Sequence, residues 1–269
     1  MKVNWFGAYG YGDCIRSMGY ANTFARKTDT PIELNIHWYG NDTEKFHSTD
    51  PESKYQRYIT LQDEISIDYN MVDIRHHFNS RDTVYQGIAW KEWDKGLHLP
   101  RFFPVFDQGL SLHALVKPKK PRLINKNQIC IWTPTSNIHS LYQWKNPLKE
   151  WNTFRGIVKA HGYDIVEMSY REPIKDAIEK VATSEFCCGY GGMGKGLAGL
   201  FWKPLVSITE RPNNTYRETP WAYPVDNLRD FHNLPTMIEE SIKRIPIVQR
   251  DYNRYINNQG FKIERYDIF

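Results

Sequence analysis

Apolar positions along the chain follow two periods in turn, which predicts alternating strands and helices. Residues 2–6 and 31–37 carry the short apolar or alternating pattern of strands. Between them, apolar residues recur at helical spacing and predict a helix over residues 15–26. A strand, a glycine-containing turn and a helix at the start of a chain are typical of an α/β fold.

The alternation is clearer after residue 122 and implies a parallel sheet with right-handed crossovers. Residues 65–69 and 71–74 could be strands, whereas residues 41–45 look like loop and 102–106 are broken by Pro104. In the second half, strands are predicted at residues 128–132, 163–168, 185–188 and 205–208, and helices at 147–160, 173–182, 197–202 and 234–256.

These elements predict an α/β protein with two Rossmann-like halves and a long C-terminal helix. Residues 117–122 are basic, contain two prolines and are predicted to link the halves. The predicted domains are residues 1–120 and 121–269. Ligands in open α/β sheets bind at the carboxyl ends of strands, so both halves are expected to face one cleft.

Composition is that of an ordinary globular protein, with 41% hydrophobic and 25% charged residues. No run approaches the ~18 apolar residues of a spanning helix and the N-terminus has no apolar leader, so no membrane partner is expected. The four cysteines form no C-x-x-C pair, which argues against a disulfide framework or zinc site and fits the cytoplasm. A net charge of +4 and 14% aromatic residues permit a nucleic-acid partner without requiring one.

The densest chemical signal is a glycine-rich segment between a predicted strand and a predicted helix. Glycines permit close backbone approach, and the N–H groups of a helix N-terminus bind phosphate. The segment therefore predicts a phosphate or diphosphate site, with a flexible turn as the alternative. It contains Gly189, Gly191, Gly192, Gly194 and Gly196.

The same segment suggests a second hypothesis, a P-loop kinase or ATPase. Gly189 to Lys195 matches G-x-x-x-x-G-K, in which the lysine reaches the phosphates. Gly196, however, stands where a Ser or Thr would bind Mg²⁺.

A second glycine turn, Gly10-Tyr-Gly12-Asp13, follows the first predicted strand. A carboxylate at the mouth of a helix can act as general base toward a docked hydroxyl, although Asp is also a preferred helix N-cap. Ile15 stands where a dinucleotide fingerprint has its third glycine, so that motif fails.

Polar side chains also follow two strands of the second half. Thr133 and Ser136 offer hydroxyls to phosphate oxygens, with Lys145 or Lys149 adding charge, unless they form a solvated loop. Glu172 closes the next strand, where its carboxylate could accept hydrogen bonds from a ribose or favour the first turn of a helix.

Together these motifs resemble the heptosyltransferase-like glycosyltransferases of GT-B fold. The resemblance rests on the strand before Thr133–Ser136, the helix start around Pro147, the glycine segment followed by Leu197-Ala and Lys203-Pro204, and the Gly10–Asp13 turn. Residues 40–115 show no match. Gly196 stands in place of the family's histidine, and Lys195 is expected to supply the missing positive charge.

The resemblance implies a nucleotide-diphosphate sugar donor, UDP-linked, and a single inverting displacement with Asp13 as base. No D-x-D pair occurs, so no metal is expected, and the helix terminus would stabilise the leaving diphosphate. The implied donor-binding residues are Gly10, Gly12, Thr133, Ser136, Lys145, Glu172, Gly191, Gly192, Met193, Gly194 and Lys195.

The expected acceptor is 5-hydroxymethylcytosine in double-stranded DNA. The sequence resembles T-even-type phage enzymes that glycosylate this base, including the arabinosyl-transferring kind, and its Lys, Asn, Tyr and Ile usage is typical of an AT-rich phage genome. This implies the cytoplasm of an infected host. A surface glycan is the alternative acceptor, and a non-catalytic nucleotide-sugar or DNA-binding protein is a third class. Candidate DNA contacts, each of which could instead be solvated surface, are Arg75, His76, His77, Lys117, Lys119, Lys120 and Arg122.

Overall fold

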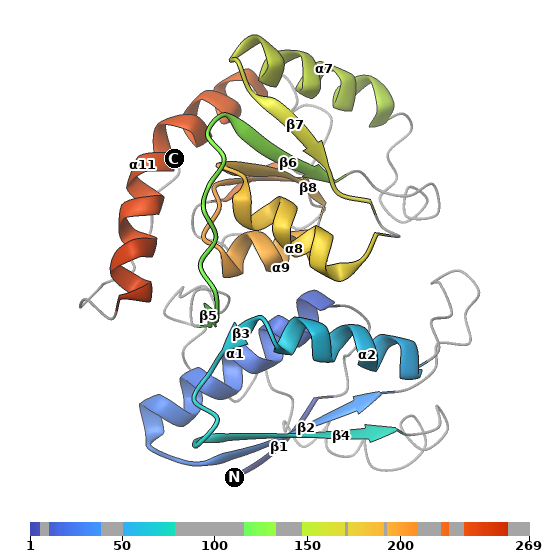
Figure 1. Cartoon of the computed structure of the whole chain (residues 1–269), viewed down its shortest axis with the longest axis vertical. Helices are drawn as coiled ribbons and strands as arrows, with labels where there is room; N and C mark the ends of the chain where they lie inside the picture. Colours follow the sequence, from blue (N-terminus) through green and yellow to red (C-terminus); the bar gives the residue numbers. More distant parts are fainter. Residues whose placement is uncertain are drawn as a thin grey trace. The chain divides into compact units, whose positions relative to one another are not determined.

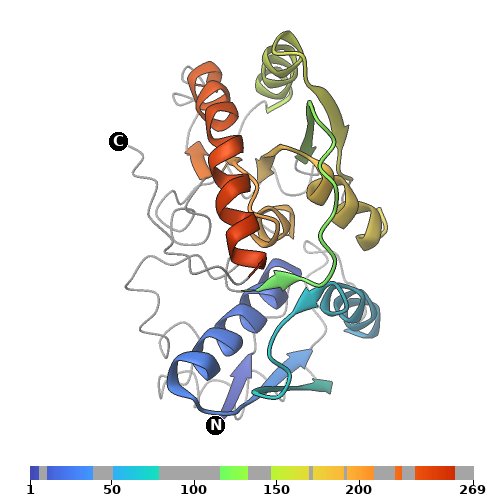
Figure 2. The same ribbon diagram turned by 60° about the vertical axis from the view of Figure 1, so that its left-hand side comes forward.

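The computed structural model describes residues 1–5, 11–38, 51–78, 116–132, 147–169, 172–190, 193–208, 222–225 and 234–257. The chain divides into two compact units, Met1–Gln108 with Leu115–Lys119 and Gly109–Ala114 with Lys120–Phe269. Each unit contains parallel strands and the helices that connect them (Figures 1 and 2). The predicted α/β class with parallel sheets is confirmed.

The first unit contains a parallel sheet in the strand order β1-β2-β4 (Figure 1). Its elements are β1 (Lys2–Trp5), α1 (Tyr11–Thr28), β2 (Ile32–Trp38), α2 (Pro51–Gln62), β3 (Ile65–Ser66) and β4 (Val72–Phe78). The two helices contact each other and cover one face of the sheet. Buried Ile32, Leu34 and Ile36 alternate with Glu33 and Asn35, so the other face of β2 is polar.

Part of the predicted linker belongs to the first unit. Strand β5 (Lys117–Pro118) pairs antiparallel with β3, and the Lys119 N–H donates to the carbonyl of Glu64 at 2.8 Å. The Lys119 ammonium also lies 5.6 Å from the centre of the Tyr69 ring. The boundary between the units therefore falls between Lys119 and Lys120.

The second unit contains a five-stranded parallel sheet in the order β10-β9-β8-β6-β7. Its elements are β6 (Gln128–Trp132), α7 (Pro147–Ala160), β7 (Asp164–Glu167), α8 (Ile174–Thr183), β8 (Phe186–Tyr190), α9 (Met193–Leu200), β9 (Leu205–Ile208), β10 (Ala222–Val225) and α11 (Leu234–Ile256). Strand β7, which follows β6 in the chain, pairs with one side of β6, whereas β8, β9 and β10 lie in that order on the other side. The direction of winding therefore reverses between β6 and β8.

Helices cover both faces of this sheet. Helices α8 and α9 contact each other on one face, and α7 and α11 contact each other on the other (Figures 1 and 2). Cys188 belongs to the core beneath α7 and α11, so its strand neighbour Cys187 faces the opposite side. That core contains Ile129, Ile131, Phe154, Val158, Phe186, Cys188, Val206, Ile238 and Ile245.

Four predicted elements of the second unit, β6, α7, β9 and α11, have the bounds that the sequence indicates. One expected helix has other bounds, and one strand was not expected. Helix α9 begins at Met193 rather than at residue 197, so Gly194, Lys195 and Gly196 are helical. Strand β10 was not predicted, because Pro224 interrupts its apolar pattern; a proline is tolerated there since β10 is the edge strand of the described sheet.

Candidate functional site

The reversal of winding between β6 and β8 identifies the candidate site. In open α/β sheets, ligands bind outside the carboxyl ends of the strands, at the point where the strand order reverses. Here that point lies where β6 ends at Trp132, β8 ends at Tyr190, and α9 begins at Met193. The glycine-rich segment that the sequence singled out is therefore at the expected edge of the sheet.

Trp132 explains two of the glycines. Its side chain is only 6% exposed, and it lies in register with Gly189 on the neighbouring strand. A Cβ built on Gly189 would lie 2.2 Å from the indole Cε2 and Nε1 atoms, and one on Gly194 would lie 2.3 Å from Cε2. Both distances are far below van der Waals contact, so both positions require glycine because the indole lies against their backbone.

This packing corrects one interpretation made from the sequence. The close approach that the glycine pattern predicts is made, at Gly189 and Gly194, by a tryptophan of the same unit. Both residues are also the fixed glycines of the P-loop pattern. The positions that lie between β8 and α9 are Gly191 and Gly192, and they are outside the described residues.

Met193 and Lys195 both lie in the first turn of α9. Met193 is half-buried, and the Lys195 side chain is among the buried charged groups at 7% exposed. A helix N-terminus carries partial positive charge, so a lysine there is unfavourable unless an anion is close. The two predicted donor-binding residues are thus at the helix end that follows β8.

Glu172 lies between β7 and α8, and its carboxylate is held from one side only. Oε2 forms an ion pair with the Lys180 ammonium, which also donates to the carbonyl of Glu167 at 2.8 Å. Oε1 is buried and has no hydrogen-bond partner among the residues that the structure describes. The side chain is 10% exposed, so water does not replace that partner freely. A buried carboxylate oxygen without a donor costs about 1–3 kcal/mol, which a ligand hydroxyl would offset.

The neighbourhood of Cys130 places this ion pair beside β6. Burial raises the pKa of the Cys130 thiol, and the nearby Cys187 and Glu172 act in the same sense, whereas Lys180 opposes them. This electrostatic effect indicates that Glu172 is close to β6. Glu172 also follows β7, whose last residue Glu167 pairs with Ile131 of β6, which puts it toward the carboxyl edge of the sheet.

Several predicted site residues lie outside the described residues. They are Gly10, Thr133, Ser136, Lys145, Gly191 and Gly192. Helix α1 begins at Tyr11 rather than at residue 15, so Gly12 and Asp13 lie inside its first turn and Asp13 is not the N-cap. The role of Asp13 as a base stays a prediction. The structure does not describe the Asp13 side chain.

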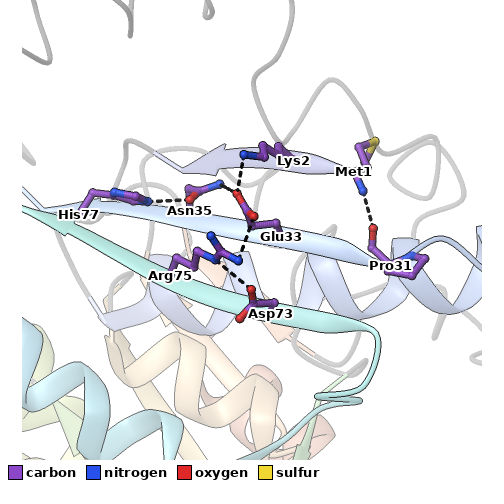
Figure 3. Close-up of polar contacts among 8 residues, drawn as sticks. All are labelled: Met1, Lys2, Pro31, Glu33, Asn35, Asp73, Arg75 and His77. Atoms are coloured by element: carbon purple, nitrogen blue, oxygen red, sulfur yellow. Dashed lines mark hydrogen bonds and ion pairs between the residues drawn. The ribbon is translucent and has the colours of Figure 1, made fainter.

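The predicted DNA contacts on β4 have partners inside the first unit (Figure 3). The Arg75 guanidinium lies 3.3 Å from Glu33 Oε2 and 2.9 Å from Asp73 Oδ2, so its charge is shared with two carboxylates. The ring centre of His76 lies 4.8 Å from that of Tyr55 and 5.2 Å from that of Tyr58 on α2. Burial, with His77 acting in the same sense, lowers the pKa of His76 to about 4, so this imidazole is neutral at pH 7.

The basic segment 117–122 is divided between the units. Lys117 and Lys119 belong to the first unit, and Lys120 and Arg122 to the second. Arg122 Nε lies 2.7 Å from Glu179 Oε2, and its guanidinium lies 5.8 Å from the centre of the Phe201 ring. Arg122 thus packs against residues of the second unit, to which it belongs. DNA binding by these residues stays a prediction.

Sequence reasoning missed three relationships that the structure displays. Lys180, the partner of Glu172, lies eight residues further along the chain on α8, a spacing that no motif marks. Trp132 and Gly189 are distant in sequence and meet only through strand register. Asn35 and His77 form a polar pair on adjacent strands. The two contacts between strands can be recognised only once the strand order is known.

Within the described part of the chain, no group of three or more His, Cys, Asp and Glu side chains is arranged to hold a metal ion. None of the described helices is long and apolar enough to cross a membrane.

Fold and site together define an α/β protein with a candidate ligand-binding edge at a reversal of strand order. No known family pattern matches the sequence, and no curated protein matches it. Among solved structures, the chain is similar to the bacterial iron-containing dodecameric glycosyltransferase TibC from enterotoxigenic E. coli H10407. The TM-score is 0.48 at 13% sequence identity, over 95% of this chain and 76% of that chain.

A second structure, the dodecameric iron-containing heptosyltransferase TibC in complex with ADP-D-β-D-heptose, matches at a TM-score of 0.46 and 13% identity over the same shares. Likeness at this level describes a general arrangement of strands and helices. The function is therefore argued below from this chain's own residues.

Proposed function

We propose that this protein is a glycosyltransferase that moves a sugar from a nucleotide-diphosphate donor, UDP-linked, to a hydroxyl acceptor. The observation that carries the proposal is the Glu172 carboxylate. Lys180 holds one oxygen, and the other is buried close to β6 without a donor among the described residues. Vicinal hydroxyls of a ribose supply the donors that this oxygen lacks. Glu172 is accordingly proposed as the ribose-binding residue.

The diphosphate is proposed to lie at the N-terminus of α9. Support comes from the reversal of winding between β6 and β8 and from the helix that starts at Met193. Backbone N–H groups and the helix dipole there favour an anion. Thr133, Ser136, Lys145, Gly191, Gly192 and Lys195 complete the proposed donor site, whereas Gly194 serves it through its packing on Trp132.

In the proposed reaction Asp13 removes the proton from an acceptor hydroxyl. The oxygen then forms a bond to the anomeric carbon while the bond to the diphosphate breaks, and the nucleotide leaves with the electron pair. This single displacement inverts the configuration of the sugar. The helix N-terminus and Lys195 or Lys145 stabilise the leaving group, so no metal is required.

The proposed acceptor is 5-hydroxymethylcytosine in double-stranded DNA, with arabinose or glucose as the sugar. The supporting observations are the sequence resemblance to phage enzymes of this kind and the mildly basic charge of +4. A surface glycan is the alternative acceptor, and the assay below separates the two. The competing P-loop kinase is disfavoured because Trp132 lies against both fixed glycines of its pattern.

The test is incubation of the protein with a panel of nucleotide sugars and with plain or hydroxymethylated duplex DNA, with and without a chelator. Nucleoside mass spectrometry should detect a sugar on the modified base in both conditions. Consumption of the nucleotide sugar without any modified nucleoside would favour a surface glycan as the acceptor. Mg²⁺-dependent ATP hydrolysis that Lys195→Ala abolishes would instead establish the kinase.

Glu172→Gln tests the observation itself. The variant should weaken UDP binding in calorimetry by about tenfold, or ~1.4 kcal/mol, because the amide lacks the charge that accepts ribose hydroxyls. Glu239→Gln, an exposed change on α11, is the matched control and should bind normally. Unchanged UDP affinity in Glu172→Gln would remove the main support for the proposal.

A further inference from the structure

The two oxygens of the Glu172 carboxylate differ in what they offer to a ligand. Oε2 forms an ion pair with the Lys180 ammonium, whereas Oε1 is buried without a hydrogen-bond partner among the described residues. An ionised carboxylate only accepts hydrogen bonds, and each of its oxygens has two acceptor positions. Oε1 therefore suits a ligand that presents two donors close together.

Lys180 fixes the orientation of this carboxylate. Its ammonium also donates to the carbonyl of Glu167 at 2.8 Å. Glu167 is the last residue of β7 and pairs in register with Ile131 of β6. The ion pair is thus attached to the carboxyl edge of the sheet, and the carboxylate cannot turn away from it without losing Lys180.

The burial of Glu172 determines how strongly a missing ligand hydroxyl is penalised. On an exposed carboxylate, water takes the place of the missing hydroxyl at little cost. The Glu172 side chain is only 10% exposed, so a ligand that covers Oε1 without donating to it leaves a buried acceptor unpaired. Sites built to bind a hydroxyl reject analogues that lack it for this reason.

Two donors on adjacent carbons are present in a ribose, whereas a 2′-deoxyribose has only one of them. Nucleotide-sugar donors occur with either pentose, since uridine diphosphate donors contain ribose and thymidine diphosphate donors contain 2′-deoxyribose. An acceptor that is buried, fixed and unpartnered distinguishes these two classes of donor.

We propose that Glu172 selects ribonucleoside-diphosphate sugars against 2′-deoxyribonucleoside-diphosphate sugars, and that Lys180 positions the carboxylate for this selection. Both ribose hydroxyls donate to Oε1 while Lys180 keeps Oε2. The inference rests on the proposed glycosyltransferase function and narrows the class of its donor. Both residues belong to the second unit.

The test compares UDP with 2′-deoxy-UDP, which differ by one hydroxyl, in calorimetry. We expect the Kd of wild type for 2′-deoxy-UDP to be about tenfold higher than that for UDP. Glu172→Gln should reduce this ratio to about threefold or less, because a neutral amide oxygen is a weaker acceptor than a carboxylate. Glu239→Gln, the exposed change on α11, should keep the ratio of wild type. Equal Kd values in wild type, or an undiminished ratio in Glu172→Gln, would overturn the inference.

Two changes at Lys180 test its positioning role. Lys180→Arg retains a cation for Oε2 and should keep the discrimination between the two nucleotides. Lys180→Met releases the carboxylate and should bring the ratio of Kd values close to one. A lysine that only stabilises the fold would leave the ratio unchanged in both variants, and that result would overturn its positioning role.

The wild-type comparison requires no variant, so it remains decisive if Lys180→Met does not fold. Failure of the wild type to consume any nucleotide sugar overturns the proposed function and this inference with it. Consumption of a uridine diphosphate sugar, together with equal affinity for UDP and 2′-deoxy-UDP, overturns this inference alone.

Discussion

The indole of Trp132 lies against the backbone of Gly189 so closely that a methyl group at position 189 would stand 2.2 Å from it. The two residues are partners in the register of β6 and β8, and Gly194 of α9 meets the same ring. The strand, the indole and the helix thus form one packed unit at the edge where the proposed donor binds.

Gly189→Ala should therefore destabilise the protein by about 1–3 kcal/mol, because the new methyl group overpacks the site. Urea denaturation measures the effect. Trp132→Leu removes the ring, so the double variant should lose less than the sum of the single variants, with a coupling energy of about 1–3 kcal/mol. Strict additivity would show that the indole is not what excludes a side chain at residue 189.

Gly156→Ala is the matched control and is expected to act in the opposite direction. Gly156 lies within α7, and an added Cβ would meet nothing within 4 Å. Alanine should stabilise the helix by about 0.5–1 kcal/mol, because it loses less backbone freedom on folding than glycine. A higher urea midpoint with an unchanged slope is the expected result, and destabilisation would contradict the assignment of open space there.

Gly162→Ala should cost about 1–2 kcal/mol although there is also room for its methyl group. Gly162 follows α7 with a φ of +81°, a conformation that L-residues adopt with strain. Comparison with Gly156→Ala separates backbone strain from the loss of space, since neither added Cβ has a neighbour. Equal stabilities of the two variants would argue against the left-handed conformation at residue 162.

Lys203 should make stability depend on alkaline pH. It is 3% exposed, and burial lowers its pKa from 10.5 to about 8, opposed by Cys187 and Glu185. Between pH 8 and 10.5 the unfolded chain keeps the proton that the folded protein has released, so stability rises with pH across this window. Below pH 8 both states are protonated, and the folded state carries the full cost of the buried charge.

The measurement is the difference in free energy of unfolding between wild type and Lys203→Met. This difference should rise in favour of the wild type by up to about 3 kcal/mol between pH 8 and 10.5. Buried thiols have the opposite slope but are present in both proteins, so they cancel. Lys175→Met, an exposed change on α8, is the matched control. A flat difference curve would mean that the Lys203 ammonium reaches solvent.

Lys180→Met should weaken UDP binding at Glu172, although Lys180 itself is not proposed to contact the nucleotide. Without its ion-pair partner the carboxylate is buried and unpaired, which costs about 3–5 kcal/mol. Adding Glu172→Gln should restore part of the stability while leaving UDP binding weak. Recovery of UDP binding in the double variant would assign the donor contact to another residue.

The sequence predicts most of the second unit because its strands and helices have strong apolar periods. Strand β6 and helices α7 and α11 have the bounds expected from pattern alone. Helix α2 was missed because Tyr58 and Leu61 are its only described apolar residues that are fully buried, which gives a weak period. The apolar pattern of a segment reflects which of its residues are buried. It therefore fails to predict a helix of which few residues are buried.

The candidate site was predictable in kind and less so in detail. Glycines after a strand indicate close approach, but residue types alone do not say whether the approaching group is a phosphate or an indole. Glu172 was singled out from its place after β7, yet its unpartnered oxygen depends on Lys180 and on burial, which are tertiary facts. The Asn35–His77 pair needed strand order as well as sequence.

The beginning of α9 at Met193 has a consequence for the energetics of binding. Since β8 ends at Tyr190, only Gly191 and Gly192 separate an anchored strand from an anchored helix. A segment with five glycines would ordinarily lose much conformational freedom when it closes on a ligand. Here three of the five, Gly189, Gly194 and Gly196, lie within β8 or α9, so their backbone freedom is already lost when the protein folds. The proposed anion at the helix end would therefore be bound by N–H groups of α9 that folding has already oriented.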